Sequence, residues 1–316
     1  MLVAEALDLF DARCEDQLKP KTVRFYRQRF KAFRNEFGHR ELKDVKAIEI
    51  ETFLARQART GGKGGKPLSN STRRHSAVVL ETFQHWMLDR EILDKPLFKK
   101  LEKPPMGRRE RYPTDEETAQ LLAHAPPDFA RIYQVSELCG ARPGEVCSAK
   151  IGDWDQTPGE QAIILQDHKT AGKTGKPRVI LVSSHVEKLL RESVAGREQD
   201  LMAPLFLTKQ GKAWTPEHYS RTYTRVRRAA GLPDGLVLYS ARHKAITNVC
   251  RNAGVMVAKD FAGHSTVQTT QRYVHLSRGD ILKAAEALKP VTASPAPQPP
   301  GKLDNLQTEL QPPKAA

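Results

Sequence analysis

A short segment rich in proline and arginine interrupts the chain about a third of the way along. Residues 103–113 contain Pro104, Pro105, Gly107 and three arginines. Apolar residues recur with helical spacing on both sides of this segment but not within it, and proline and glycine disfavour a continuing helix. The segment therefore predicts a linker between two domains. This suits a chain of 316 residues, because a domain usually has about 150.

The first part of the chain is expected to be a helical domain over residues 1–103, joined by a linker over 104–112 to a second domain over 113–290. Apolar residues recur at helical spacing in four of its stretches, and the last is preceded by the capping residues Ser69 and Asn70. The four predicted helices are 4–16, 20–37, 47–58 and 71–90.

The second domain combines helices with a predicted pair of strands. Residues 162–165 and 178–182 favour strands and flank a turn-rich stretch, which predicts an antiparallel hairpin. Helical spacing occurs at 115–125, 128–140, 185–195, 215–230, 239–253, 255–262, 266–274 and 278–289. The expected fold class is mainly α with a small antiparallel β-sheet. Residues 291–316 contain six prolines and no apolar period, which predicts a disordered tail.

The composition excludes several classes of protein. No apolar run approaches the roughly 20 residues that cross a bilayer, so we expect no membrane partner. The first sixteen residues hold five acids and no basic residue before Arg13, unlike a signal peptide. The four cysteines form no Cys-x-x-Cys pair, which argues against a zinc site or a disulfide framework. These features predict a cytoplasmic protein.

Positive charge is concentrated towards the N-terminus. Residues 1–112 hold 25 basic and 16 acidic residues, and the whole chain has a net charge of +14. The stretch 19–34 has seven basic residues and no acid, and a polyanion such as DNA would relieve the repulsion among them. A second basic face is expected on the helix at 215–230. The candidate DNA-binding residues are Arg24, Arg27, Lys31, Arg34, Arg73, Arg74, Arg221, Arg225 and Arg228.

Four short motifs in the second domain stand out by their order. They are Gly140-Ala141-Arg142-Pro143-Gly144-Glu145, His168-Lys169-Thr170, Tyr239-Ser240-Ala241-Arg242-His243, and Gly263-His264-Ser265 followed by Tyr273. Each motif alone is weak evidence. Together they offer what attack on a phosphodiester requires, namely fixed arginines for the charge that develops on the phosphate oxygens and a hydroxyl nucleophile.

In this order, the motifs resemble the tyrosine recombinase or phage integrase family. The family pattern is an arginine at the start of a helix, a lysine in a β-hairpin, His-x-x-Arg, Gly-His and a tyrosine about nine residues later. The resemblance covers nearly the whole chain. It implies that residues 1–103 are a helical core-binding domain of SAM-like fold and that residues 113–290 are the α+β catalytic domain.

The resemblance also implies the roles of individual residues. Arg142 and Arg242 match the family's arginine pair, and Tyr273 matches its nucleophile. Lys169 matches the hairpin lysine, which would give a proton to the departing 5′-oxygen, and His264 matches the histidine of Gly-His.

Tyr239 departs from the family pattern, because it stands where the family usually has the histidine of His-x-x-Arg. A phenol with a pKa near 10 is a poor base at neutral pH, although its hydroxyl can still donate a hydrogen bond to a phosphate. We retain Tyr239 among the candidate catalytic residues. The change leaves open the alternative of a catalytically inactive DNA-binding protein with the same fold.

The function implied by the resemblance is site-specific DNA recombination through a 3′-phosphotyrosyl intermediate. No metal or other cofactor is expected, because the acids do not form the pairs that two-metal nucleases use and no nucleotide-binding motif is present. The implied partners are double-stranded DNA, further copies of the chain in a homotetramer, and accessory proteins that bend DNA or set the direction of the reaction. A monomeric type IB topoisomerase remains an alternative. The implied location is the cytoplasm, at the nucleoid.

Overall fold

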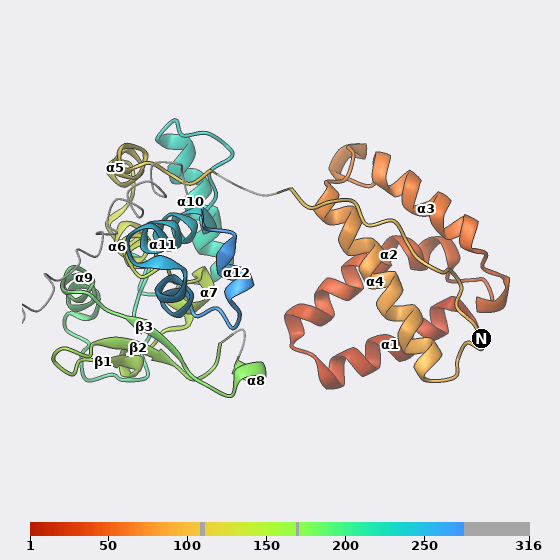
Figure 1. Ribbon diagram of the computed structural model, residues 1–316, viewed down its shortest axis with the longest axis horizontal. Coiled ribbons are helices and arrows are strands. Elements are labelled where there is room, and N and C mark those ends of the chain that lie inside the picture. Colours follow the sequence, from red (N-terminus) through yellow and green to blue (C-terminus); the bar gives the residue numbers. More distant parts are fainter. Residues whose placement is uncertain (108–110, 169–170, 275–316) are drawn as a thin grey trace, which may run out of the picture. The chain divides into compact units, whose positions relative to one another are not determined.

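The chain forms two compact units, the first from Met1 to Glu110 and the second beginning at Arg111 (Figure 1). The computed structural model describes residues 1–107, 111–168 and 171–274. The predicted helix at 278–289 and the predicted tail at 291–316 lie outside the described residues.

The first unit is built from four helices joined by short connections (Figure 1). They are α1 (Val3–Gln17), α2 (Pro20–Phe37), α3 (Ala47–Thr60) and α4 (Asn70–Asp89). Two 3-10 turns, Leu42–Asp44 and Lys63–Gly65, lie between them. The helices agree with the four predicted segments at nearly every end, because the caps and prolines that bound them are local signals.

An aromatic cluster packs these helices together. Phe10 of α1 is 1% exposed, and its ring makes edge contacts with Phe30 of α2 and Phe83 of α4 at centroid distances of 5.7 and 5.4 Å. Edge-to-face aromatic pairs each contribute roughly 0.5–1.5 kcal/mol beyond the burial of their area. The aromatic residues of α2 that point inward therefore stabilise the unit.

The second unit combines helices with a small sheet that lies along one side of it (Figure 1). Its longer helices are α5 (Asp115–Ala123), α6 (Pro127–Leu138), α9 (Ser184–Val194), α10 (Pro216–Ala229) and α11 (Tyr239–Ala262). Its short helices are α7 (Pro143–Ser148), the 3-10 turn Ile151–Asp153, α8 (Ala171–Thr174) and α12 (Val267–Gln271).

The sheet has three antiparallel strands in the order β1-β2-β3, with β1 at Trp154–Asp155, β2 at Ala162–Leu165 and β3 at Arg178–Leu181. Ile163 of β2 lies opposite both Trp154 and Ile180. The predicted hairpin is confirmed, whereas β1 was not predicted because two residues are too few to show alternation. The fold class is mainly α with a small antiparallel β-sheet, as expected.

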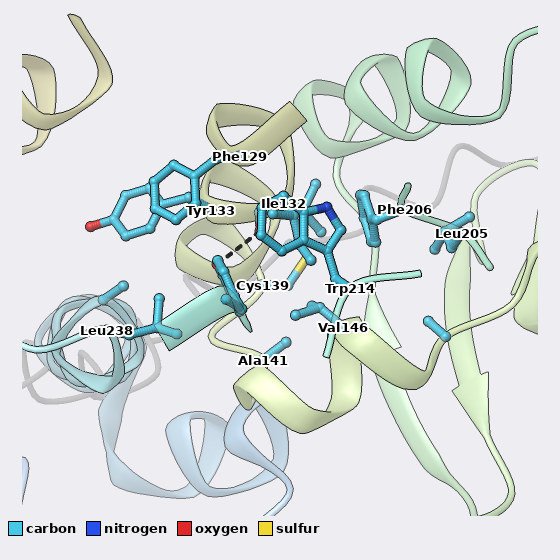
Figure 2. Close-up of a cluster of buried hydrophobic side chains, with 14 of the residues drawn as sticks. Phe129, Ile132, Tyr133, Cys139, Ala141, Val146, Leu205, Phe206, Trp214 and Leu238 are labelled. Carbon is cyan, nitrogen blue, oxygen red and sulfur yellow. Dashed lines mark hydrogen bonds between the residues drawn. The ribbon is translucent and has the colours of Figure 1, made fainter. Parts of the chain in front are cut away.

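The core of the second unit is centred on α6 (Figure 2). Phe129, Ile132 and Tyr133 of this helix have no exposed surface. Figure 2 shows them close to Trp214, and the same cluster continues to Val146 of α7. Since α11 and α7 both pack against α6, these two helices are held near each other.

The long helix α11 is bent at Gly254, where φ is +82° and ψ is 169°. This bend matches the break predicted between the segments 239–253 and 255–262. The helix ends at Gly263, whose φ of +62° is the left-handed conformation that favours glycine. Although α11 has 24 residues, neither it nor another helix in the described part of the chain is apolar enough to cross a membrane.

Replacing Gly140 with alanine is expected to destabilise the second unit. Gly140 has a φ of +56°, and a Cβ atom at this position would lie 2.6 Å from the Phe261 ring. We expect the free energy of unfolding, measured by urea denaturation, to fall by about 2–4 kcal/mol, because left-handed strain adds to the steric clash.

Gly144→Ala is the matched control, because a Cβ atom at this position in α7 would have no neighbour within 4 Å. Alanine is the better helix former, so Gly144→Ala should change stability by no more than about 1 kcal/mol, in the favourable direction. Equal changes in the two variants would contradict the structural explanation.

Candidate active site

Arg142 and Glu145 form an ion pair at the start of α7. Glu145 accepts hydrogen bonds from the Arg142 backbone N–H at 2.8 Å and from its guanidinium Nη1 at 2.6 Å. The carboxylate is 5% exposed and the Arg142 side chain 18% exposed. Burial alone would raise the pKa of Glu145, but its bonds with Arg142 outweigh burial and lower it. Glu145 therefore stays ionised and orients Arg142.

Arg242 lies in the first turns of α11 with only 1% of its surface exposed. Its Nη1 donates to the carbonyl of Gly140, and its Nη2 donates to the carbonyl of Ala262 at 2.7 Å. Its Nη2 also lies 3.3 Å from Nε2 of His264. Burial and then the nearby Arg142 charge lower the pKa of Arg242. The predicted arginine pair is thus brought together from segments a hundred residues apart.

Arg178, at the start of β3, is a third buried arginine that the sequence analysis missed. It is 4% exposed, donates from Nη2 to the carbonyl of Phe261 at 2.9 Å, and places Nε 3.8 Å from Oε2 of Glu145. Burial lowers its pKa to about 10, so it remains charged at neutral pH. In β3 the inward positions are Arg178 and Ile180, whereas Val179 is exposed, so hydropathy alternation carried no signal for this residue.

His264 is held as a neutral imidazole beside Arg242. Its Nδ1 lies 2.8 Å from Oγ1 of Thr270, and its Nε2 faces the Arg242 guanidinium. Since a guanidinium can only donate, Nε2 accepts and Nδ1 carries the proton that is donated to Thr270. Burial, followed by the charges of Arg242 and Arg142, lowers the pKa of His264 to about 4.

The predicted nucleophile Tyr273 follows α12 and packs between two imidazoles. Its ring centroid lies 6.0 Å from that of His264, with the rings stacked, and 5.3 Å from that of His243. The ring of Tyr239 also packs against His243, with 5.2 Å between the two ring centroids. Burial and the neighbouring Tyr239 raise the pKa of Tyr273, although Arg242 opposes them. Tyr273 is therefore protonated at neutral pH.

Tyr239 is joined to the arginines through its hydroxyl, which accepts a hydrogen bond from Arg142. Burial lowers the pKa of Arg142, but Glu145 and Tyr239 outweigh this effect and leave the pKa above its ordinary value. The residue that replaces the family's usual histidine is thus part of the cluster. Lys169, the predicted hairpin lysine, lies outside the described residues.

The cluster carries an excess of buried positive charge. Glu145 forms ion pairs with Arg142 and Arg178, its charge also acts on Arg242, and the neutral His264 adds no charge. Burying like charges together is unfavourable unless an anion compensates them. The arrangement is suited to binding an anion such as a phosphodiester, with a phenol beside it. No group of acids, histidines and cysteines within the described ranges could hold a metal ion.

The predicted basic face of α2 is partly neutralised within its own unit. Arg27 donates from Nε to Asp11 at 2.9 Å and also pairs with Glu15, and Arg34 pairs with Asp8. The stretch 19–34 contains no acid of its own, and the acids that pair with Arg27 and Arg34 come from α1. Repulsion among the basic residues of α2 is therefore partly relieved within the unit, without DNA.

The remaining predicted DNA-binding residues lie at the surface. Arg24 and Lys31 of α2 are exposed, and Arg73 and Arg74 of α4 are partly exposed. On α10 the predicted basic face is present, because the residues between its arginines are mostly buried. Its exposed members are Arg221, Arg225 and Arg228.

The fold and this cluster define a protein of the tyrosine recombinase class. The chain belongs to the phage integrase family, whose profile matches residues 114–279. The chain is 24% identical over 285 residues to the tyrosine recombinase XerC of Shewanella amazonensis, which spans 87% of this chain and 92% of that relative.

Two solved structures show the same fold at low sequence identity. A lambda integrase (75-356) dimer bound to a COC' core site has a TM-score of 0.72 and 16% identity, covering 88% of this chain and 97% of that one. A lambda integrase tetramer bound to a Holliday junction has a TM-score of 0.72 and 15% identity, covering 86% of this chain and 77% of that one.

The neutral state of His264 predicts a dependence of stability on pH. Its folded pKa of about 4 lies below the ordinary 6.5, so the unfolded chain binds more protons between these values. The contribution of His264 to stability is therefore complete above pH 6.5 and is lost as the pH falls towards 4. NMR of the imidazole should show a midpoint near 4.

His264→Gln should weaken the pH dependence of the unfolding free energy within this window. His185→Gln is the control, because His185 is exposed on α9 and is expected to retain the wild-type slope. An imidazole of His264 that titrates at its ordinary value would show that the burial and the arginine charges do not act on it as described.

Glu145→Gln should strongly destabilise the second unit, because the amide leaves the charges of Arg142 and Arg178 without a buried counter-ion. We expect a loss of about 3 kcal/mol in the unfolding free energy from urea denaturation. Glu187→Gln breaks the Glu187–Arg191 pair on the surface of α9 and should cost less than about 1 kcal/mol. Similar small losses in both variants would contradict the role assigned to Glu145.

Proposed function

We propose that this protein is a site-specific DNA recombinase that cuts and rejoins DNA through a covalent bond between Tyr273 and a 3′-phosphate. The observation that carries the proposal is the convergence of Arg142, Arg242, His264 and Tyr273 in one cluster. Arg142 directly precedes α7 and Arg242 lies in the first turns of α11, whereas His264 follows α11 and Tyr273 follows α12. Membership of the phage integrase family supports the same reaction class.

The arginines bind the scissile phosphate and stabilise the charge that develops on its non-bridging oxygens. Arg142 is the more exposed of the pair and has a fixed orientation through Glu145. Arg242 adds a second positive charge and holds the imidazole of His264. Preorganised donors of this kind stabilise the transition state because they need no rearrangement when charge appears.

In the cleavage step, the Tyr273 oxygen attacks phosphorus and loses its proton, and the bond from phosphorus to the 5′-oxygen breaks. We assign the proton that the 5′-oxygen receives to Lys169, on the strength of the family resemblance. Rejoining reverses these steps with a 5′-hydroxyl from another strand. The phosphotyrosyl bond conserves the energy of the broken phosphodiester, so the proposal requires neither ATP nor a metal ion.

The two units have different roles in the proposal. The first unit, over residues 1–103, is a core-binding domain that contacts the DNA backbone, and the second, over 113–290, is the catalytic domain. We assign backbone contacts to Arg24, Lys31, Arg73 and Arg74 in the first unit and to the exposed arginines of α10 in the second.

The assembly proposed for the reaction is a homotetramer on two DNA sites. The similar lambda integrase structures contain a dimer on a core site and a tetramer on a Holliday junction, which supports this stoichiometry. Accessory proteins that bend DNA or set the direction of the reaction would act on this assembly, at the nucleoid in the cytoplasm.

A second candidate function is DNA binding without cleavage, and Tyr239 is the observation that favours it. A phenol that accepts a bond from Arg142 is not a base at neutral pH, so the position cannot remove the proton of Tyr273 as a histidine could. The two candidates differ in whether a covalent protein–DNA adduct forms.

Tyr273→Phe should abolish the covalent adduct because it removes the attacking oxygen and keeps the ring packed between His243 and His264. The measurement is incubation with a DNA substrate that is nicked near the cleavage position, followed by electrophoresis in SDS. DNA affinity, measured by gel shift, should change by less than about 1 kcal/mol.

Tyr223→Phe is the control, because Tyr223 is a buried tyrosine on α10 away from the cluster, and this variant should still form the adduct. An adduct in Tyr273→Phe would place the nucleophile elsewhere. Absence of any adduct in the wild-type protein, on DNA that it binds specifically, would favour the inactive DNA-binding protein.

A further inference from the structure

In the proposed function, on which this inference rests, Tyr273 loses a proton when its oxygen attacks phosphorus. A neighbouring group must accept that proton. Burial raises the pKa of Tyr273, so the hydroxyl is protonated before attack. A protonated phenol is a weak nucleophile, and a neighbouring base is the usual means of activating it. Three side chains in the described part of the site have rings near enough to consider: Tyr239, His243 and His264.

Tyr239 is a poor acceptor for chemical reasons. Its hydroxyl accepts a hydrogen bond from the Arg142 guanidinium, so the lone pairs of its oxygen face a cation. Protonating a neutral phenol is strongly unfavourable, and the side chain offers no other group that accepts a proton. Tyr239 therefore interacts with Arg142 and is not the acceptor of the Tyr273 proton.

His264 is committed to other bonds. Its Nε2 faces the Arg242 guanidinium at 3.3 Å, and its Nδ1 is 2.8 Å from Thr270. A proton added to Nε2 would break the contact with Arg242 and place a second positive charge beside it. Burial and the arginine charges lower the pKa of this imidazole to about 4, which makes it a positioning group rather than a base.

His243 lies on the same face of α11 as Tyr239, one helical turn later. Its ring is 5.2 Å from the Tyr239 ring at 69° and 5.3 Å from the Tyr273 ring at 34°. The half-buried imidazole thus contacts both tyrosines, and it is one turn along α11 from the position that the family usually fills with histidine.

We propose that His243 is the proton acceptor for Tyr273 in strand cleavage. The Tyr273 O–H bond breaks and its proton passes to a ring nitrogen of His243, while the Tyr273 oxygen forms its bond to phosphorus. The bond from phosphorus to the 5′-oxygen breaks, and that oxygen takes a proton from Lys169. In rejoining, the 5′-hydroxyl returns its proton to Lys169, and the imidazolium of His243 returns its proton to the tyrosine oxygen.

The groups around His243 suit this role. Within the described residues, the titratable rings packed against it are Tyr239 on its own helix and Tyr273 after α12. The nearby cations Arg142 and Arg242 act on the Tyr239 hydroxyl and the His264 imidazole. Burial raises the pKa of Tyr273, whereas Arg242 and Arg142 oppose this effect and so favour loss of its proton.

The test compares His243→Phe with His243→Ala in single-turnover cleavage of a nicked DNA substrate. Phenylalanine keeps the ring contacts with both tyrosines and removes the nitrogens, whereas alanine leaves space for an added base. Both variants should cleave at least about 100-fold more slowly than the wild-type protein, which is the contribution expected of a general base. DNA affinity by gel shift should stay within about threefold of the wild-type value.

Added imidazole separates a proton acceptor from a packing residue. It should restore cleavage by His243→Ala in proportion to its concentration, and methylimidazoles of higher pKa should restore more. It should not restore His243→Phe, in which the ring fills the space. Wild-type rates in His243→Phe, or no response of His243→Ala to any imidazole, would overturn the proposal.

A substrate with sulfur in place of the bridging 5′-oxygen tests the direction of proton transfer. A thiolate departs without needing a proton, so this substrate should restore cleavage by Lys169→Ala and leave His243→Phe slow. Restoration of His243→Phe by the sulfur substrate would overturn the proposal, because His243 would then donate to the leaving group.

Two controls keep this inference separate from the proposed function. His185→Phe, on the exposed surface of α9, should cleave like the wild-type protein. Failure of the wild-type protein to form an adduct would refute the recombinase proposal itself. A wild-type adduct together with unimpaired His243→Phe refutes only the role assigned to His243.

Discussion

The buried guanidinium of Arg242 connects the segments from which the site is made. It donates to the carbonyl of Gly140, to the carbonyl of Ala262 and towards the imidazole of His264. The two carbonyls lie just before α7 and at the end of α11, so the Arg242 side chain sets the distance between the start of α7 and the end of α11. A buried charged group without such partners would cost several kcal/mol, and this cost makes the arrangement specific. The glycine at position 140 lets the backbone turn so that its carbonyl reaches the arginine.

The same burial creates the chemical character of the site. Arg142, Arg178 and Arg242 share the single carboxylate of Glu145, which leaves a positive excess in a region of low dielectric. Burial and this excess together keep His264 neutral, and the excess favours an anion near the side chains. A cluster built only for stability would balance its charges, so the imbalance supports the proposed phosphate chemistry. Burial of Tyr273 disfavours its phenolate, so the proposed cleavage step requires a group that accepts the proton of Tyr273.

Two features of the structure differ from what local sequence suggested, and they share a cause. Counting acids along α2 left Arg27 and Arg34 without partners, yet α1 supplies both with carboxylates. Hydropathy along β3 favours burial of Val179, yet the strand buries Arg178 and exposes Val179. In both cases the partner lies on another element: Asp8 on α1 for Arg34, and Glu145 on α7 for Arg178. Electrostatic partners across elements leave no periodic signal in a short window of sequence.

The sequence by itself determined the helices, the hairpin and the identity of most of the cluster. Helix and strand patterns depend on backbone hydrogen bonds and side chains only a few residues apart, and the ordered motifs around Arg142, Arg242 and His264 are short strings of adjacent residues. Tertiary structure alone decided how these groups meet. It decided which basic residues are neutralised, which tautomer His264 adopts, and that the imidazole of His243 packs against Tyr273. These outcomes depend on contacts between residues far apart in the chain, whose distances follow only from the packing of α6, α7 and α11 on one another.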